Sequence, residues 1–266
     1  MNGNPTPADP GPASPPLHPR WLVTSGNFFF RFRNALFPVV FAVVLLLFRP
    51  AQFLHSPSLD RIAMSIGVAI ALLGQAFRLT VIGYAYIKRG GRDGRVYATD
   101  LVIAGLYAHS RNPMYAGNFL IACGVGVVFG SPWMYFLVIP FFAYVYLSIT
   151  ATEEQYLLGR FGASFEAYMR QVNRFIPDFR GLRQSLQGYR FQWRRALSKD
   201  HGTVFATLTG LLVIMMWKLY WIYGWDAKGA EIVRLGWLFI PLLVFYVVIR
   251  ILKRFGRLNE PQAFGG

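Results

Sequence analysis

Residues Ile62 to Ile87 read IAMSIGVAIALLGQAFRLTVIGYAYI. A membrane-spanning helix needs roughly 20 mostly apolar residues, because the hydrocarbon core of a bilayer is ~30 Å thick. This stretch exceeds that length, and Arg78 is its single charged residue. It therefore predicts a helix that crosses a membrane.

Apolar runs of the same kind lie on both sides of it. The whole chain of 266 residues is 55% hydrophobic and 15% charged, whereas about a quarter of the residues in a soluble domain are charged. A chain this short could not cover six such helices with polar neighbours, so we predict an all-α, polytopic integral membrane protein with about six transmembrane helices. The other expected spans are Leu36–Leu54, Met114–Gly130, Trp133–Thr150, Val204–Tyr223 and Leu235–Leu252.

The net charge of +15 at first suggests a nucleic-acid partner, but the placement of the basic residues argues against it. They mostly lie between the apolar runs, in residues 88–111, 160–199 and 253–257. By the positive-inside rule, both termini and the two long loops are expected in the cytoplasm, which agrees with an even number of spans. The same loops would attract anionic membrane lipid.

The cysteine and histidine content predicts no metal site. Cys123 is the single cysteine, so no disulfide framework can form within the chain. The four histidines are too scattered to suggest a cluster of ligands.

Composition divides the chain into three parts. Residues 1–20 hold seven of the sixteen prolines, and residues 1–27 are expected to form a disordered tail. Residues 28–179 are expected to form a four-helix membrane core with a cytoplasmic amphipathic helix over Thr152–Arg170, which Gly162 could divide. Residues 180–266 supply a basic linker and two C-terminal transmembrane helices.

The first polar constellation lies in Leu101–Tyr115, just before the expected third span. Asn112-Pro113 suits a helix start, whose free backbone donors could meet an anionic group. Arg111 adds a forked donor, and Tyr107 and Tyr115 add aromatic faces. Together they describe an interfacial pocket for a ligand carrying both charges, although an ordinary polar helix start explains the residues about as well.

The second constellation is Glu153-Glu154, after the expected fourth span. Acidic residues suit a helix amino terminus, which is one explanation of the pair. The other is an acceptor for hydroxyl or amino groups of a ligand. The third and fourth spans form a hairpin around Ser131-Pro132, so Glu153-Glu154 and Tyr115 are expected at the same membrane face.

Arg78 is the ionisable residue inside a span, and such residues are functional candidates because burying them in lipid is costly. A structural arginine that bonds a neighbouring group is an equal alternative. The small residues of the third span, such as Gly117 and Gly124, favour close helix packing.

An ordered set of motifs then makes the chain resemble the isoprenylcysteine carboxyl methyltransferase family, which is related to the membrane phospholipid methyltransferases. The resemblance covers roughly Gly74–Phe179. It rests on Leu101-Val102, Gly105-Leu106-Tyr107, Arg111-Asn112-Pro113-Met114-Tyr115, Gly117, Ser131-Pro132, Glu153-Glu154, Leu157, Phe161-Gly162, Tyr168 and Ile176-Pro177.

The resemblance implies S-adenosylmethionine as the cofactor, bound at the cytoplasmic face, and a lipophilic or lipid-anchored methyl acceptor (a carboxylate, thiol or amine). It implies functional roles for Arg111, Glu153 and Glu154. The cofactor contacts that it implies are Thr99, Asp100, Leu101, Val102, Tyr107, Asn112, Pro113, Met114, Tyr115 and Glu153.

The sequence also departs from the family pattern. The prenylcysteine enzymes place an arginine for the substrate carboxylate shortly before the acidic pair, and Tyr144–Thr152 contains no Arg or Lys. Two other readings stay open. A sterol-type membrane reductase using NADPH shares a related pattern, but usually has an acidic residue where this chain has Asn118. A membrane scaffold or transporter would need none of the site residues.

Overall fold

The computed structural model describes residues 17–84, 90–92, 95–98 and 100–258. Its long helices are α1 (Arg20–Leu47), α2 (Pro57–Tyr84), α3 (Pro113–Phe129), α4 (Ile139–Phe161), α7 (Trp193–Trp237) and α8 (Phe239–Arg254). Its short helical elements are η1 (Phe53–His55), η2 (Gly105–Ala108), the π-helical turn η3 (Met134–Val138), α5 (Ala163–Gln171) and α6 (Leu182–Ser185). Strands β1 (Gly90–Arg92) and β2 (Arg95–Tyr97) pair antiparallel, with Arg92 opposite Arg95.

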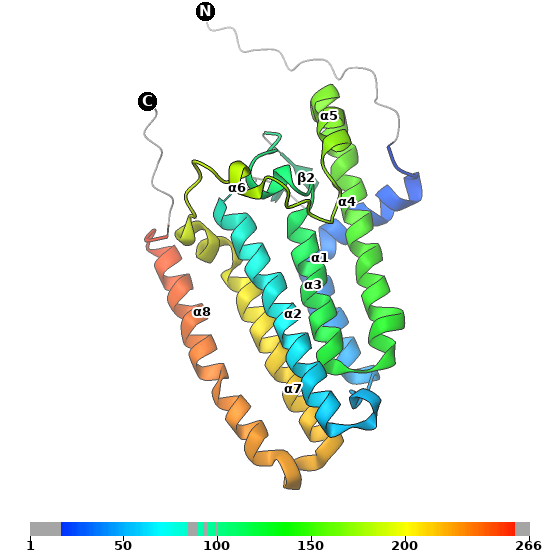
Figure 1. Ribbon diagram of the computed structural model, residues 1–266, viewed down its shortest axis with the longest axis vertical. Helices are drawn as coiled ribbons and strands as arrows, with labels where there is room; N and C mark the ends of the chain where they lie inside the picture. Colours follow the sequence, from blue (N-terminus) through cyan, green and yellow to red (C-terminus); the bar gives the residue numbers. More distant parts are fainter. Residues whose placement is uncertain (1–16, 85–89, 93–94, 99, 259–266) are drawn as a thin grey trace, which may run out of the picture.

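The long helices form one elongated bundle (Figure 1). Helix α2 packs against α3 and α7, α1 packs against α4, and α8 packs against the outside of α7. The short elements α5, α6 and β2 gather at one end of the bundle, and the first turns of α1 and the last turns of α8 lie toward that same end (Figure 1). We call this the loop end of the bundle.

Helix length and composition identify a membrane protein. Within the described residues, three helical stretches are long and apolar enough to cross a membrane, and the bent α1 is a fourth if it counts as one span. Helix α3 is apolar but has only 17 residues. The last stretch, Trp193–Arg254, is not one rod, because Gly224 has φ 77° and ψ 169° and the chain then runs back beside α7 (Figure 1). A helical membrane protein is thus confirmed, and the count of six spans stays a prediction.

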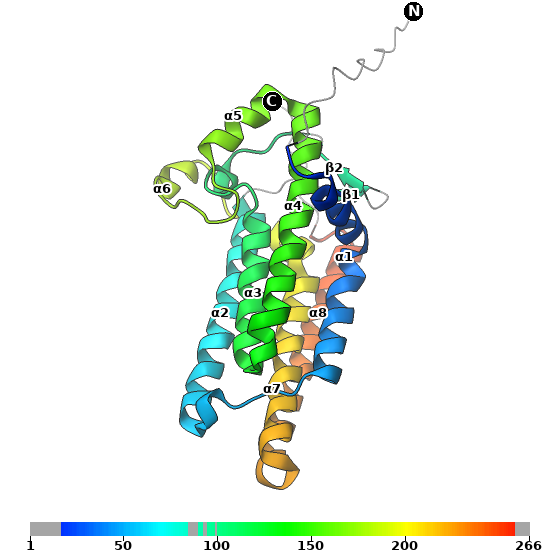
Figure 2. The same cartoon turned by 90° about the vertical axis from the view of Figure 1, so that its right-hand side faces the viewer.

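Helix α1 bends by 85° between Arg20–Arg33 and Ala35–Leu47. Pro38 lies inside the helix and has no backbone N–H to bond the carbonyl four residues earlier, which weakens the helix at this bend. Figure 2 shows the dark blue first half turned away from the axis of the second half. Residues 20–27, which we expected in the disordered tail, are therefore helical, and residues 1–16 lie outside the described part of the chain.

Helix α4 continues past the expected end of the fourth span. It runs without a break to Phe161, and Gly162 (φ +48°) separates it from α5. The break at Gly162 is confirmed, but a separate amphipathic helix beginning at Thr152 is wrong. Glu153 and Glu154 lie inside α4 rather than at a helix amino terminus, so the helix dipole does not explain them.

Glycines let α2 and α3 pack at backbone distance. A Cβ atom added at Gly124 would lie 2.5 Å from the carbonyl oxygen of Gly67, and one added at Gly74 would lie 2.7 Å from that of Gly117. Both distances are far below van der Waals contact. The small residues of α3 therefore serve packing, which is how helices associate closely in lipid.

Helix α7 is held in the middle of the bundle by two buried ion pairs. Arg78 of α2 pairs with Asp200, and the ammonium of Lys218 lies 2.7 Å from Oδ1 of Asp60 on α2. Asp60 and Arg78 are as far apart along α2 as Asp200 and Lys218 are along α7, ~27 Å of helix. The two pairs thus fasten α7 to α2 near both ends of the span, and the packing does not separate residues 28–179 from residues 180–266.

Candidate functional site

Two loops are hydrogen-bonded to each other at the loop end of the bundle, and they position the start of α3. The backbone N–H of Arg111 donates to the carbonyl of Asn173 at 2.8 Å, and that of Asn112 donates to Arg174 at 3.1 Å. The hydroxyl of Ser110 donates to the carbonyl of Phe175 at 3.1 Å. Residues 109–112 are therefore fixed by the segment that follows α5, which explains why both stretches occur in the motif set.

The start of α3 follows from Asn112-Pro113. Pro113 occupies the first turn, where its fixed φ and missing N–H carry no penalty. The side chain of Asn112 does not cap the helix but donates from Nδ2 to the carbonyl of Arg174 at 3.2 Å. Met114 and Tyr115, in the first turn, then line the interior of the bundle.

The hairpin of α3, η3 and α4 brings the two polar constellations together. The hydroxyl of Tyr115 donates to Oε1 of Glu153 at 3.0 Å. Both residues line one cavity, and Glu153 is 5% exposed. The expectation that Tyr115 and the acidic pair lie close together is therefore confirmed.

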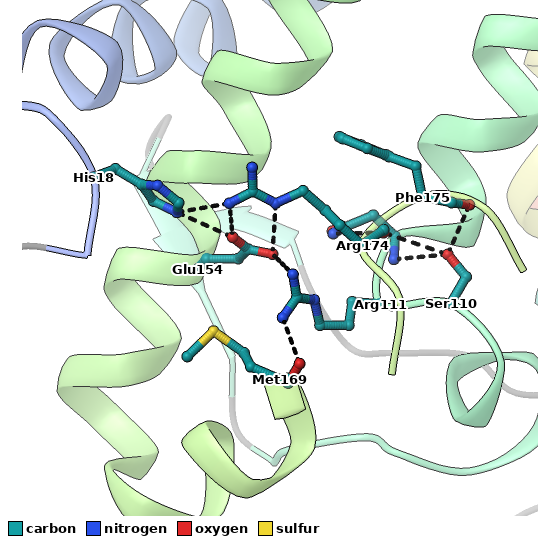
Figure 3. Close-up of polar contacts among 8 residues, drawn as sticks. His18, Ser110, Arg111, Glu154, Met169, Arg174 and Phe175 are labelled. Carbon is teal, nitrogen blue, oxygen red and sulfur yellow. Dashed lines mark hydrogen bonds and ion pairs between the residues drawn. The ribbon is translucent and has the colours of Figure 1, made fainter. Parts of the chain in front are cut away.

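The neighbouring Glu154 has a different environment, in which three basic side chains converge on it (Figure 3). Arg111 reaches Oε1 at 3.2 Å, Arg174 forms a two-pronged contact with both oxygens, and His18 Nε2 lies 3.0 Å from Oε2. Glu154 is 2% exposed and does not line the cavity. It therefore ties the start of α1, α4 and two loops together, and its oxygens are already committed.

Arg111 contributes to both the Glu154 cluster and the cavity. Its Nη1 donates to the carbonyl of Met169 at 3.2 Å, and its Nε is buried without a hydrogen-bond partner among the described residues. Burial lowers the pKa of this guanidinium from its ordinary value, while the Glu154 carboxylate acts in the opposite sense. An arginine stays charged under these conditions, so Arg111 offers one unused charged donor to a ligand.

The cavity has a volume of about 790 Å³, within the range of roughly 300–1,000 Å³ of small-molecule sites. At the loop end its walls are polar, and deeper in the bundle they are apolar. The polar walls are Tyr107, Arg111, Asn112, Tyr115 and Glu153. The apolar walls include Phe41, Val44, Val125, Val138 and Ile214, and the buried core of the bundle closes that end.

A layer of aromatic rings lies along the cavity between its polar and apolar parts. Tyr146 lies 5.5 Å from Tyr115 and 5.9 Å from Phe37, measured between ring centroids. Phe37 also stacks on Phe142 at 5.2 Å. All four side chains line the cavity. Their faces provide an environment suited to a cation or an apolar chain.

Arg78 is both a cavity wall and the centre of a buried hydrogen-bond network. Its guanidinium bonds both oxygens of Asp200 and the side-chain oxygen of Asn118. Nε2 of Gln75 donates to Asp200 at 2.7 Å, and the hydroxyl of Thr207 donates to Gln75 at 3.1 Å. The charge of Arg78 is therefore compensated by Asp200, which supports the structural alternative that its sequence position left open.

Arg33, at the bend of α1, is a further cation on the cavity wall that the sequence did not single out. Its guanidinium lies 4.2 Å from the ring centroid of Phe30. Among the described residues no carboxylate forms an ion pair with it, whereas Arg78 and Arg111 each have one. The mid-helix bend that brings Arg33 to the cavity depends on the three-dimensional packing of α1 on α4.

Some of the residues expected in the site line the cavity, and others do not. Tyr107, Arg111, Asn112, Met114, Tyr115 and Glu153 line the cavity together. Leu101 packs with Leu157, Val102 packs with Val81, and Asp100 is exposed. Pro113 is buried at the start of α3, and Thr99 lies outside the described residues. Within the described part of the chain, no cluster of three or more His, Cys, Asp or Glu side chains is arranged to hold a metal ion.

Comparison with known proteins finds similarity to membrane methyltransferases over part of the chain. The family described as phospholipid methyltransferase matches residues 62–164. The protein-S-isoprenylcysteine O-methyltransferase of Schizosaccharomyces pombe is 38% identical over 81 residues, which cover 29% of this chain and 33% of that protein. The cobalt-zinc-cadmium resistance protein CzcN of Cupriavidus metallidurans is 30% identical over 168 residues, which cover 61% of this chain and 72% of that protein. No solved structure matches the chain.

Proposed function

We propose that this chain, a member of the membrane methyltransferase family of the phospholipid and isoprenylcysteine enzymes, transfers a methyl group from S-adenosylmethionine to a lipophilic acceptor. The observation that carries the proposal is a single cavity with two kinds of wall. One end is built from the residues of the shared motif, and the other end is an apolar channel inside the bundle.

The residues at the polar end suit this cofactor chemically. It carries a carboxylate, an amino group, ribose hydroxyls and a sulfonium. The unused Nε donor of Arg111 suits the carboxylate, and Glu153 suits the amino group or the hydroxyls. The aromatic faces of Tyr115 and Tyr146 suit a sulfonium cation. Glu153 lines the cavity and Glu154 does not, so we assign the cofactor contact to Glu153.

The bound cofactor supplies the activated methyl group, and the protein has to align the acceptor and exclude water. Glu153 and Tyr115 hold each other in position through their hydrogen bond. The ring layer of Phe37, Tyr146 and Phe142 separates the polar end from the apolar channel. An acceptor whose head reaches this layer and whose chain fills the channel would be oriented without a covalent enzyme intermediate.

The orientation in the membrane completes the proposal. The basic segments between the spans favour a cytoplasmic position for the loop end, the polar end of the cavity and both termini. The acceptor then enters from the bilayer, while a water-soluble cofactor reaches the polar end from the cytoplasm. Six crossings would place both termini on one side.

Binding of S-adenosylhomocysteine is the direct test. Calorimetry on the protein in detergent is expected to give saturable binding of this product and none of NADPH. Glu153→Ala and Tyr115→Ala should weaken it by roughly tenfold or more, because each removes a hydrogen bond that involves a charged group. Binding of NADPH alone would favour the reductase, and unchanged affinity for S-adenosylhomocysteine in both variants would show that the site is misplaced.

The charge of Arg33 bears on the acceptor. Arg78 and Arg111 are paired, so Arg33 adds uncompensated positive charge to the cavity, and this favours a carboxylate or thiolate over an amine. Dodecanoic acid is expected to displace a cavity-bound fluorescent fatty acid roughly tenfold more effectively than dodecylamine, a preference that Arg33→Gln removes and Arg33→Lys largely keeps. Equal displacement by acid and amine in the unsubstituted protein would contradict an anionic acceptor.

A further inference from the structure

Helix α7 forms one wall of the cavity, although it lies beyond residues 62–164, the part that matches the family. Ala206, Gly210, Val213 and Ile214 of α7 line its apolar part, opposite α1 and α3. The two buried ion pairs, Arg78–Asp200 and Asp60–Lys218, fix α7 against α2 along this length. The position of this wall relative to α2 is therefore fixed.

Buried side chains line the inner end of the cavity. Val44 of α1, Met134 and Val138 near the turn between α3 and α4, and Ile214 of α7 line its inner end and belong to the same buried core cluster. Between Gly202, at the polar end, and Ile214 the wall of α7 is ~18 Å long. An extended hydrocarbon chain of roughly fourteen carbons has this length, because bonds of about 1.5 Å advance by only about 1.3 Å each in a zigzag.

Gly210 of α7 and Phe41 of α1 both line the cavity. A Cβ atom at Gly210 would lie 3.7 Å from the ring of Phe41, which is ordinary contact, so any larger side chain there would take up space between α1 and α7. Helix α1 packs mainly on α4, whereas α7 packs on α2, α3 and α8. Phe41 of α1 and Gly210 of α7 thus lie on opposite walls of the cavity.

We propose that α7 is a length gauge for the methyl acceptor, which is a single-chain amphiphile whose chain runs along Ala206 and Gly210 and ends at Ile214. This inference rests on the proposed function, because it takes the ligand in the cavity to be the methyl acceptor. It adds the form of that ligand: one extended chain of limited length, in a channel closed at its inner end. It also gives α7 a part in substrate selection.

The test measures the chain length at which affinity stops rising. Saturated fatty acids from hexanoic to octadecanoic acid compete with a diazirine-bearing dodecanoic acid for photocrosslinking to the protein in lipid nanodiscs with S-adenosylhomocysteine. Competition should strengthen by about fourfold for each added methylene and level off near roughly fourteen carbons. Gly210→Leu should move this plateau roughly five carbons shorter, since Gly210 lies ~6 Å above Ile214. Ala206→Leu, one turn nearer the polar end, should move it further.

Gly236→Leu is the matched control, because Gly236 also lies in α7 but outside the cavity walls. Partition of the acids into the nanodisc lipid is the same for every variant and cancels in the comparison. A plateau that stays in place in Gly210→Leu and Ala206→Leu, or an equal loss at every chain length, would overturn the gauge. If Gly210→Leu does not fold, Ala206→Leu decides alone, because it enlarges a side chain already present.

Binding of S-adenosylhomocysteine to the same samples separates the two proposals. A shifted plateau without binding of this compound would leave the length gauge standing and remove the methyltransferase assignment. Normal binding with an unshifted plateau would do the reverse.

Discussion

Asp200→Ala is expected to cost the protein about 3–5 kcal/mol of stability, because it leaves the guanidinium of Arg78 buried without its carboxylate. Asp200 is 1% exposed, and it accepts hydrogen bonds from Gln75 as well as from Arg78. Thermal unfolding in detergent should fall by more than about 6 °C. Helix α7 would also lose its fastening to α2 at the loop end, while the Asp60–Lys218 pair remains.

Two further variants show whether the uncompensated charge is the cause. Asp200→Ala combined with Arg78→Met should recover most of the lost stability, because a buried pair is often replaced by apolar groups at little cost. Asp226→Ala, at an exposed position of the same helix, should stay within about 0.5 kcal/mol of the unsubstituted protein. A double variant as unstable as Asp200→Ala would mean that α7 is held by packing rather than by this pair.

The sequence was sufficient for the parts of the fold that depend on local composition. Apolar runs located each long helix, and for α3 also its ends, with Met114–Gly130 expected and Pro113–Phe129 observed. Other ends were wrong, because α1 begins at Arg20 rather than Leu36 and α7 begins at Trp193 rather than Val204. The short turn at Ser131-Pro132 correctly predicted that Tyr115 and Glu153 would meet. Periodicity was misleading in α4, where the helix passes from the apolar segment into the polar one without any break before Gly162.

What the sequence could not supply are contacts between distant helices. Arg78 was identified as a costly residue in a span, but its partner Asp200 directly follows the basic linker and lies outside the expected spans. The equal spacing of Asp60 from Arg78 and of Asp200 from Lys218 was a signal that could have been used, since antiparallel helices can match two pairs in this way. Nothing local indicated that α7 would form a wall of the cavity. Pro38 was a local signal for a bend in α1, but it did not show that the bend would bring Arg33 to the cavity.

The adjacent carboxylates of α4 also look alike in sequence and differ in structure. Glu153 lines the cavity and accepts a hydrogen bond from Tyr115, whereas Glu154 faces His18, Arg111 and Arg174. Successive residues on a helix point about 100° apart, so one faces inward and the other faces the loops. We expected both to act in the site, and the geometry favours a division between binding and stability.

Charge-removing substitutions at the two positions should therefore have opposite effects. Glu153→Gln is expected to weaken binding of S-adenosylhomocysteine by roughly 10- to 100-fold, because a charge-assisted hydrogen bond is lost, with little change in thermal unfolding. Glu154→Gln is expected to cost about 2–4 kcal/mol, because two arginines lose their shared carboxylate. Its effect on affinity should be smaller and act through the displacement of Arg111.

Calorimetry and thermal unfolding on the two variants, prepared identically, distinguish these effects. Each substitution keeps the size of the side chain and differs from the other by one position, so each serves as the control for its neighbour. Arg174→Gln should reproduce the instability of Glu154→Gln while leaving the cavity walls intact, since Arg174 contacts Glu154 but does not line the cavity. If Glu154→Gln instead lost affinity at unchanged stability, the cofactor contact would belong to Glu154, and the orientation of α4 toward the ligand would have to be reversed.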